Sequence, residues 1–276
     1  AQLVETAILS MLNHATLVAT KAARVVAAAG EAGVMEFGTR RTHGEAAVEA
    51  ARAAYIGGCV GSSNVEAGLR HGVPVFGTMA HMWTMVHETE AAAFDSFLRT
   101  YPEGTTLLVD TYGTLDGTRR ACAAARRLGR PDALAGVRVD SELFDAAGAP
   151  TGICRQMRQV LDAEGFGHTR IVVSDDMNEQ RIAALLAAGE PIDAFGVGTE
   201  LVTSRDAPAL GGVYKVVWVG GDDDDGGHGV AKLSPGKVTY PGRHQLWRTR
   251  DPHSGAIVAD RLALAAEQLE GEPLLR

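Results

Sequence analysis

The sequence is poor in cysteine, in aromatic residues and in net positive charge. Its 276 residues include three isolated cysteines, Cys59, Cys122 and Cys154, with neither disulfide-framework nor metal-ligand spacing. They are expected to be small core residues of a protein in a reducing cytoplasm. Aromatic residues make up only 5% of the chain. With its many alanines, glycines and valines, this composition is typical of a well-buried α/β protein of one or two domains.

The charge balance argues against large polyanionic partners. The chain has 26 basic and 34 acidic residues, a formal net charge of −8, which disfavours nucleic acid or an anionic membrane as the main partner. A small anionic ligand stays open, because local arginines and helix N-termini can override the net charge. We expect no secretory leader and no membrane span, because the apolar stretch from Leu3 to Ala29 is interrupted by Glu5, Asn13, His14, Lys21 and Arg24.

Residues 2–29 have the periodicity of an amphipathic helix. One face of it would carry Leu3, Ala7, Ile8, Met11, Leu12 and Ala15. The pattern begins at residue 1 without an N-cap. We therefore interpret residues 1–30 as a leading helix left from an N-terminal lobe.

Short apolar runs then alternate with helical segments. Seven runs are strand candidates: Val34–Phe37, Gly58–Gly61, Val73–Phe76, Leu107–Asp110, Val137–Asp140, Ile171–Ser174 and Ala194–Val197. Helices are predicted near 44–56, 63–71, 83–99, 115–128, 151–164 and 178–188, with C-cap glycines at Gly129, Gly165 and Gly189. Such alternation predicts a parallel sheet buried on both faces. Seven units with polar residues after each strand favour a parallel α/β barrel over residues 31–211, with an open doubly wound sheet as the alternative.

The alternation of strand and helix patterns ends after Thr199. Val213–Val219 and Val230–Leu233 are predicted to be antiparallel strands around the loop Gly220–Gly229, whose four aspartates would form a solvated turn. A β-rich lobe is therefore expected within 212–276. Its end, Arg261–Arg276, is predicted to be a weak helix followed by a tail.

The candidate functional residues lie where the strands end, since ligands of a parallel barrel meet the carboxyl ends of its strands. The segments concerned are Gly38–Arg41, Gly61–Asn64, Thr78 with His81, Asp110–Tyr112, Asp140–Glu142, Ser174–Asp176 and Gly196–Thr199. They combine arginines, small hydroxyls, carboxylates and a glycine turn. This combination suits a phosphorylated sugar, its magnesium ion and a second small anion.

Each candidate also has a plainer interpretation. The Gly196–Thr199 turn could bind phosphate through its backbone N–H groups, or be an ordinary strand exit. Arg40 and Arg41 could clamp an anion or only cap a strand end. Asp110 and Asp140 end apolar runs, where magnesium, ribose hydroxyls or an ion pair with Arg40 or Arg138 would satisfy them. His81 could be a nucleophile or acid–base group, although a lone histidine is more often structural.

Several of these segments carry a family resemblance. They are Phe37–Gly44, Gly61–Val65, Gly77–His81, Val109–Tyr112, Arg138–Ser141, Phe195–Thr199, Val213–Lys215 and Lys232–Lys237. In this order they resemble nicotinate phosphoribosyltransferases of the bacterial type, over residues 2 to about 248.

The resemblance implies an incomplete α/β barrel with a smaller β-rich lobe, working as a cytoplasmic homodimer. It implies transfer of phosphoribose from phosphoribosyl pyrophosphate to nicotinate, with Mg²⁺ as cofactor and ATP as co-substrate. The product would be nicotinate mononucleotide, for NAD biosynthesis. ATP hydrolysis would be coupled through transient phosphorylation of the histidine that matches the family's motif, His81.

The resemblance also assigns roles to residues. His81, Asp140 and Arg138 would take part in catalysis, and Arg40 and Arg138 would hold the pyridine ring and its carboxylate. Ser63 would favour the acid over nicotinamide, because relatives that prefer the amide have an aspartate there. The other substrate-binding positions would be Phe37, Thr39, Ser62, Asp110, Ser174 and Asp175, and the phosphate-binding positions Gly196, Gly198 and Thr199. The magnesium ligands are not assigned.

Three departures from the family pattern leave alternatives open. Gly113 removes a carboxylate, and Asp175 replaces a usual glycine or asparagine. The family's Asp-Ser-Gly-Asp-Leu is here Asp140-Ser141-Glu142-Leu143, through either two substitutions or a deleted glycine with Glu142 replacing the aspartate. The chain is also expected to lack the family's N-terminal domain. The alternative is a truncated or diverged paralogue that binds ligand or a partner subunit without independent catalysis. A transferase for another aromatic acid, such as quinolinate, ranks lower because it would need more basic residues around the site.

Overall fold

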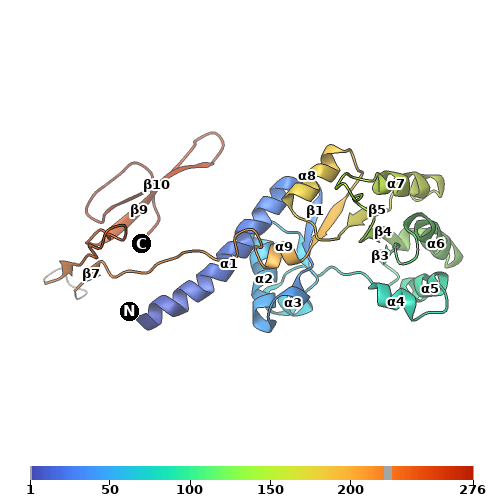
Figure 1. Cartoon of the computed structure of the whole chain (residues 1–276), viewed down its shortest axis with the longest axis horizontal. Helices are drawn as coiled ribbons and strands as arrows, with labels where there is room; N and C mark the ends of the chain where they lie inside the picture. The colour runs from blue at the N-terminus through green and yellow to red at the C-terminus, as the bar shows by residue number, and fades with distance from the viewer. Residues whose placement is uncertain (1, 221–225, 276) are drawn as a thin grey trace. The chain divides into compact units, whose positions relative to one another are not determined.

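The computed structural model describes residues 2–220 and 226–275, in two compact units. The larger unit is Ser10–Gly211, and the smaller consists of Ala1–Leu9 with Gly212–Arg276 (Figure 1). Each unit has its own secondary structure and is described separately.

A curled parallel sheet of six strands organises the larger unit. In spatial order it contains β2 (Gly61–Ser62), β1 (Gly33–Glu36), β6 (Ala194–Val197), β5 (Arg170–Val173), β4 (Leu134–Val139) and β3 (Thr105–Leu108). Most strand residues are buried, as expected for a parallel sheet covered by helices. The predicted α/β class with an incomplete parallel barrel is confirmed.

The prediction of seven strands is wrong. The run Val73–Phe76 forms a single parallel bridge, between Val75 and Ser62, rather than a strand. Pro74 has no N–H to donate, and proline is tolerated in sheets mainly at an edge. The run lies at the open edge beside β2, where Val75 and Phe76 are 48% and 41% exposed.

Nine helices and two 3₁₀ turns are found in the described part of the chain. They are α1 (Gln2–Ala29), η1 (Thr39–Arg41), α2 (Gly44–Ile56), α3 (Val65–His71), α4 (His81–Met85), α5 (Glu90–Thr100), α6 (Thr114–Arg127), η2 (Pro131–Ala133), α7 (Ile153–Ala163), α8 (Glu179–Ala187) and α9 (Thr199–Val202). The predicted C-cap glycines 129, 165 and 189 have φ values of 65°, 78° and 73°, which confirms their role.

One predicted helix, 83–99, is two helices. The first, α4, ends at Met85, and Thr89 caps the second, α5, by accepting a hydrogen bond of 3.1 Å from the backbone N–H of Ala92. A threonine whose hydroxyl caps a helix start competes with the continuous helical pattern. The break allows His81 to begin a short helix of its own.

The two halves of α1 differ in burial. Val18, Ala22 and Val25 are at most 1% exposed and belong to the main core cluster, whereas Leu3 and Met11 are 90% and 73% exposed. By length and composition alone, Leu3–Ala29 is long and apolar enough to cross a membrane, with a mean hydropathy of 1.2. The core helix of a folded domain passes the same test.

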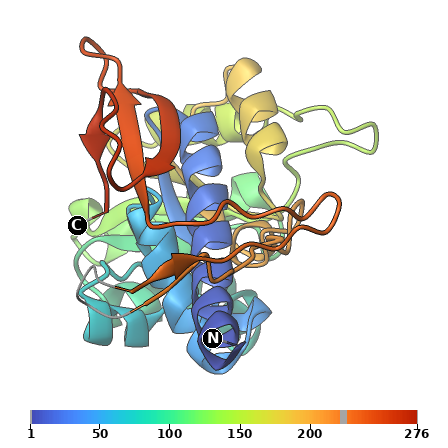
Figure 2. The same cartoon turned by 90° about the vertical axis from the view of Figure 1, so that its left-hand side faces the viewer.

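The smaller unit is β-rich, as predicted. Its main sheet has the antiparallel order β10 (Ile257–Leu264), β9 (His244–Arg250) and β11 (Glu272–Pro273), and its two longest strands, β9 and β10, lie side by side in both views (Figures 1 and 2). The predicted weak helix from Arg261 is wrong, because Arg261–Leu264 pair with β9. Hydrogen bonds to a neighbouring strand decided this segment against its weak helical pattern.

The other predicted strand pair is shorter than expected. An antiparallel pair forms between β7 (Trp218–Val219) and β8 (His228–Gly229), so Val230–Leu233 is not a strand. The aspartates of the predicted solvated turn, Asp222–Asp225, lie outside the described residues.

Candidate active site

The carboxyl ends of the parallel strands surround two adjoining cavities in the larger unit. They share Phe37, Arg40, Arg138 and Asp140. The first, of about 200 Å³, is also lined by Arg41, Ser174, Asp175, Asp176, Gly196, Gly198 and Thr199. The second, of about 360 Å³, is also lined by Ser63, Gly77, Thr78, Met79, Ala80, His81 and Leu108. Loops that are distant in sequence therefore meet because parallel strands expose their carboxyl ends at one edge.

Arg138, on β4, connects three loops around the cavities. Its guanidinium donates to Ser174 Oγ (2.7 Å), Thr78 Oγ1 (2.9 Å) and Asp140 Oδ1 (3.1 Å). It also lies over the ring of Phe37, 5.4 Å from the centroid. The Arg138 side chain is 17% exposed. A planar cation that is fixed beside an aromatic ring can hold a flat anionic ligand.

His81, at the start of α4, faces the second cavity. Its Nδ1 is 3.1 Å from Thr111 Oγ1, and its Nε2 lies 3.9 Å from both Asp110 Oδ1 and Asp140 Oδ2. The side chain is 40% exposed. Thr111 therefore orients the ring through one nitrogen, while the other faces carboxylates at the cavity. This geometry suits a nucleophile or a proton-transfer group.

Asp110 joins the ends of β3 and β4. Its Oδ2 accepts hydrogen bonds from the backbone N–H of Asp140 (2.8 Å) and from Ser141 Oγ (2.6 Å). Its Oδ1 is buried and has no hydrogen-bond partner within the described residues. The Asp110 side chain is fully buried and reaches the site through the backbone of Asp140 and through His81. Such an unpaired oxygen is costly unless a proton or cation reaches it.

Gly196 and Gly38 lie at positions where a side chain would collide with neighbouring residues of the cavity wall. A Cβ on Gly196 would lie 2.3 Å from the Phe37 ring, and a Cβ on Gly38 would lie 2.4 Å from Val202 and 2.9 Å from the carbonyl oxygen of Gly198. Neither position has space for a larger residue. The two glycines therefore allow the Phe37 segment to pack against the turn that leads into α9.

Asp175 has a backbone conformation that disfavours its side chain. Its φ is 99°, in the region that favours glycine. Burial and the nearby carboxylates of Asp140 and Asp176 raise the pKa of Asp175, while Arg181, whose guanidinium is 3.0 Å away, lowers it. Glycine would fit this backbone. The departure therefore adds both strain and negative charge to the first cavity.

We expect Asp175→Gly to stabilise the protein and to tighten anion binding. Removing the unfavourable φ should raise the free energy of unfolding by about 1 kcal/mol, and loss of a carboxylate should strengthen pyrophosphate binding by about tenfold. Denaturation and calorimetric titration with pyrophosphate measure the two effects. Asp175→Asn is the control, because it removes the charge and keeps the strained backbone. If the two variants are equally stable, the backbone argument is wrong.

The other two departures lie beside the site. Gly113 has φ 166°, an extended backbone that any residue adopts, and a Cβ there would meet nothing within 4 Å. Glu142 has φ 60°, and its Oε2 accepts a hydrogen bond of 2.6 Å from Thr114 Oγ1 at the start of α6. Glu142 is therefore held by α6 and does not line either cavity.

Most of the predicted site residues meet at the two cavities. Those that line them are Phe37, Arg40, Ser63, His81, Arg138, Asp140, Ser174, Asp175, Gly196, Gly198 and Thr199. Three do not: Thr39 is exposed on η1, Asp110 lies behind His81, and Ser62 is fully buried with its hydroxyl on Glu36. Glu36 itself was missed. Glu36 could have been recognised by the same feature as Asp110 and Asp140, a carboxylate within an apolar run.

Comparisons with known proteins point to one family. The nicotinate phosphoribosyltransferase (NAPRTase) family matches residues 32–219. The chain is 45% identical over 276 residues to nicotinate phosphoribosyltransferase pncB2 of Mycobacterium tuberculosis, covering 100% of this chain and 56% of that protein. It is 40% identical over 280 residues to nicotinate phosphoribosyltransferase of Bacillus subtilis, covering 100% of this chain and 55% of that protein.

A solved structure shares the fold. The crystal structure of nicotinate-nucleotide pyrophosphorylase from Pyrococcus furiosus has a TM-score of 0.75 and 29% sequence identity, over 99% of this chain and 66% of that one. The chain thus spans just over half the length of the two relatives named above.

Proposed function

Because this chain belongs to the nicotinate phosphoribosyltransferase family, we propose that it forms nicotinate mononucleotide from nicotinate and phosphoribosyl pyrophosphate, with ATP hydrolysis, in NAD biosynthesis. The observation that carries the proposal is the cavity wall in which Arg138 lies over the Phe37 ring, with Arg40 on the same wall. A flat aromatic acid matches an aromatic ring beside two guanidinium groups.

The described residues support the following chemistry. Arg138 and Arg40 would hold the carboxylate of nicotinate, and the Phe37 ring would pack against its pyridine ring. The pyridine nitrogen attacks the anomeric carbon while the bond from that carbon to the pyrophosphate oxygen breaks, and pyrophosphate leaves with the electron pair. Asp140, which Arg138 and Ser174 orient, would stabilise the positive charge that develops on the sugar ring. Positioning supplies most of the remaining effect.

The phosphate groups would bind at the other cavity. Thr199 and the Gly196–Gly198 turn line it together with Arg41, which supplies a hydroxyl, a backbone turn and a cation for an anion. Ser63 lines the second cavity, where it presents no negative charge to a substrate carboxylate. These positions support the roles that the family resemblance implies for them.

Magnesium fits the oxygen ligands around the first cavity. No group of three histidine, cysteine, aspartate or glutamate residues that could hold a metal ion is present within 2–220 and 226–275. Mg²⁺ that is bound through substrate phosphates needs only one or two carboxylates and water. Asp140 and Asp176 line the cavity and would supply them. The ion would neutralise charge on the departing pyrophosphate.

Replacement of His81 tests the proposed coupling to ATP. We propose that His81 Nε2 is transiently phosphorylated by ATP and that the phosphoryl group then passes to water. His81→Ala should abolish ATP hydrolysis that depends on nicotinate, while nicotinate mononucleotide still forms slowly from saturating phosphoribosyl pyrophosphate. Simultaneous measurement of ADP and nicotinate mononucleotide checks this.

The matched control is His87→Ala. His87 Nδ1 is 2.7 Å from the carbonyl oxygen of Trp83, and His87 does not line either cavity. This variant should keep the coupling. Equal ADP release by His81→Ala and the unaltered protein would contradict the assignment.

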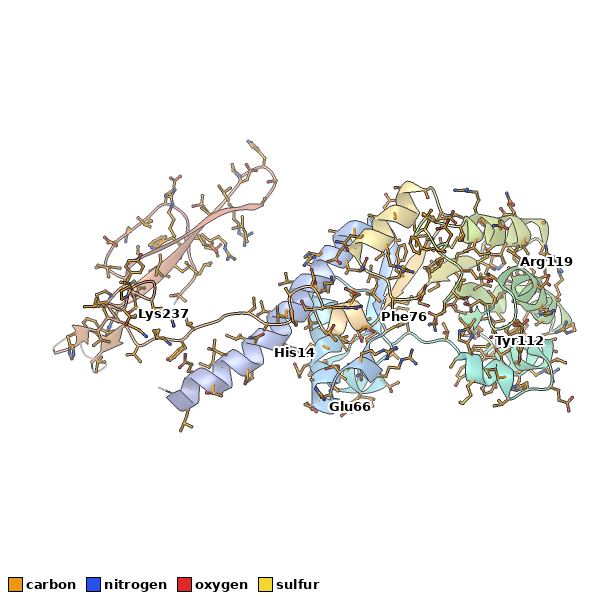
Figure 3. All side chains as sticks on the ribbon, viewed as in Figure 1. His14, Glu66, Phe76, Tyr112, Arg119 and Lys237 are labelled. Atoms are coloured by element: carbon orange, nitrogen blue, oxygen red, sulfur yellow. The ribbon has the colours of Figure 1, made fainter. Side chains whose placement is uncertain are left out.

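We also propose that the chain acts as a homodimer in the cytoplasm. The exposed apolar side chains of α4 support association: Met82, Met85 and Val86 are 70%, 65% and 70% exposed directly after His81. Phe76 and Tyr112, from the two open edges of the sheet, are also exposed (Figure 3). Sedimentation velocity tests the mass, and a monomer at micromolar concentration would refute the dimer.

The second candidate is a diverged protein that binds ligand without independent catalysis. The backbone strain at Asp175 and the replacement of a family carboxylate by Gly113 favour it. Calorimetry with nicotinate and phosphoribosyl pyrophosphate, followed by a single-turnover assay, separates the two. Binding without turnover supports the second candidate, turnover supports the first, and absence of binding rejects both.

A further inference from the structure

A buried glutamate lies directly beneath the two loops that carry Arg40 and Ser63. Glu36, the last residue of β1, is completely buried, in register with Ser62 of β2 and Val197 of β6. It precedes Phe37 and η1 but lines neither cavity. Full burial of a glutamate among three parallel strands is uncommon unless its oxygens have defined partners.

Each carboxyl oxygen of Glu36 holds one of the two loops. Oε1 accepts a hydrogen bond from the backbone N–H of Gly38, at the start of the Arg40 loop. Oε2 accepts one of 2.5 Å from Ser62 Oγ. The Ser62 hydroxyl oxygen in turn accepts the backbone N–H of Asn64 at 2.9 Å. A single side chain therefore connects the backbone of two loops that both contribute residues to the second cavity.

The surrounding backbone makes this connection rigid. The carbonyl oxygen of Glu36 accepts the N–H of Ser63 at 2.9 Å, and the carbonyl oxygen of Gly38 accepts the N–H of Arg41 at 2.7 Å. Asn64 caps α3 by accepting the N–H of Ala67 at 2.9 Å. A displacement at Glu36 would consequently move Arg40 and Ser63, which line the same cavity.

Keeping this carboxyl group in the interior is unfavourable. Burial raises the pKa of Glu36, and the hydrogen bonds from Ser62 and Gly38 only partly oppose that effect. The neighbouring thiol of Cys59 has a pKa of about 12, because of burial and the charge of Glu36. An apolar residue would avoid the desolvation of a buried acid but would leave the Gly38 N–H and the Ser62 O–H without partners.

We propose that Glu36 is a positioning residue that sets the affinity for the aromatic acid by holding the Arg40 loop and the Ser63 loop at a fixed separation. The proposal rests on the proposed function for the identity of the ligand, but its structural part does not. Glu36 contacts neither substrate nor reacting atoms. Its effect passes through Gly38 and Ser62 to Arg40 and Ser63.

Two matched variants separate positioning from general stability. Glu36→Ala removes both acceptors. Glu90→Ala is the control: Glu90 is 4% exposed and pairs with Arg120 at 2.7 Å at the start of α5, but it does not line either cavity. Glu36→Gln keeps the side-chain size and the acceptor for Gly38, so it should restore much of the function. Ser62→Ala removes only the hydrogen bonds that run from Glu36 through the Ser62 hydroxyl to Asn64, and it preserves the buried carboxyl group.

The experiment combines amide hydrogen exchange with nicotinate titration. Glu36→Ala should speed exchange at the N–H groups of Gly38 and Asn64 by about tenfold and weaken nicotinate binding or raise its KM by about tenfold, with a smaller change in kcat. Glu36→Gln should remain within about threefold of the unaltered protein, and Glu90→Ala should change neither quantity.

Exchange at Gly38 and Asn64 that is unchanged in both Glu36→Ala and Ser62→Ala would overturn the proposal. Faster exchange with an unchanged nicotinate KM would overturn its functional part. If the unaltered protein binds no nicotinate, the proposed function fails, and the exchange data still decide whether Glu36 holds the two loops. If Glu36→Ala does not fold, Ser62→Ala replaces it as the disrupting variant, with faster exchange expected at the N–H of Asn64, and Glu36→Gln stays the conservative control.

Discussion

Under the proposed function, Arg138→Ala is expected to lower kcat/KM for nicotinate by at least about 100-fold, because it removes a positioned cation and frees three other site residues. Ser174, Thr78 and Asp140 each lose a hydrogen bond of 2.7–3.1 Å, and Phe37 loses its stacked guanidinium. Steady-state kinetics with nicotinate at saturating phosphoribosyl pyrophosphate measure the effect. Arg138→Lys should recover little, because an ammonium group cannot reach three partners in the geometry of the guanidinium fork.

The chain offers a close control for this prediction. Arg126, on α6, also lies 5.4 Å from the centroid of a phenylalanine ring, that of Phe166, and pairs with Glu164 at 2.6 Å. It is 48% exposed and does not line either cavity. Arg126→Ala should leave kcat/KM within about threefold of the unaltered value. Similar losses from both variants would mean that Arg138 acts through stability, and retention of activity by Arg138→Ala would refute its role at the site.

Lys21→Met is expected to lower the free energy of unfolding by about 3–5 kcal/mol, because it removes the central cation of a buried charge cluster. Lys21, on α1, is 2% exposed, and its ammonium group lies 2.7 Å from Glu179, 2.9 Å from Asp206 and 3.6 Å from Glu200. Arg24 also pairs with Glu179 and Asp206, at 2.9 and 2.6 Å. Without Lys21 the carboxylates of Glu179 and Glu200, whose side chains are 12% and 11% exposed, would repel each other with little screening by solvent.

Urea denaturation followed by circular dichroism measures this loss. The control is Lys215→Met, which makes the same change at a more exposed pair. Lys215 is 3.2 Å from Glu5, and the two side chains are 39% and 32% exposed. It should cost no more than about 1 kcal/mol, as is usual for surface ion pairs. A loss below about 1 kcal/mol for Lys21→Met would contradict the cluster argument.

The stability that this charge cluster provides should also depend on pH. Hydrogen bonds from Lys21 and Arg24 lower the pKa of Asp206 from 3.8 to about 2. A carboxyl group with a lowered folded-state pKa contributes stability above its unfolded pKa, and that contribution is lost as pH falls from 3.8 towards 2. Lys21→Met should make the decrease in stability over this pH range smaller. An unchanged acid profile would show that Asp206 owes its low pKa to Arg24 alone.

Lys21 connects the cluster to the active site through the starts of two helices. Glu179 begins α8, which follows the Asp175–Asp176 turn, and Glu200 lies in α9, directly after Thr199. Both helix starts are thus anchored on α1 from behind the first cavity. The second half of α1 is therefore part of the support of the site.

Local patterns predicted most of the larger unit. Apolar runs without polar alternation identified the strands, and the glycines at 129, 165 and 189 identified helix ends, because burial on both faces and left-handed C-caps leave direct traces in sequence. The incorrect secondary-structure predictions also have identifiable causes. Pro74 reduced a predicted strand to one bridge, Thr89 divided a predicted helix, and pairing with β9 made Arg261–Leu264 a strand.

Residue types and their positions after the apolar runs specify which groups can do chemistry here: the arginines, the carboxylates, the hydroxyls and His81. Which of these groups share a cavity depends on the order of the strands in space, in which β1 lies between β2 and β6. The tertiary structure also turned Ser62 inward to Glu36 and gave Asp175 a φ of 99°. Periodicity records whether a residue is buried, whereas the direction of a side chain and the identity of its partners are set by segments far away in the chain.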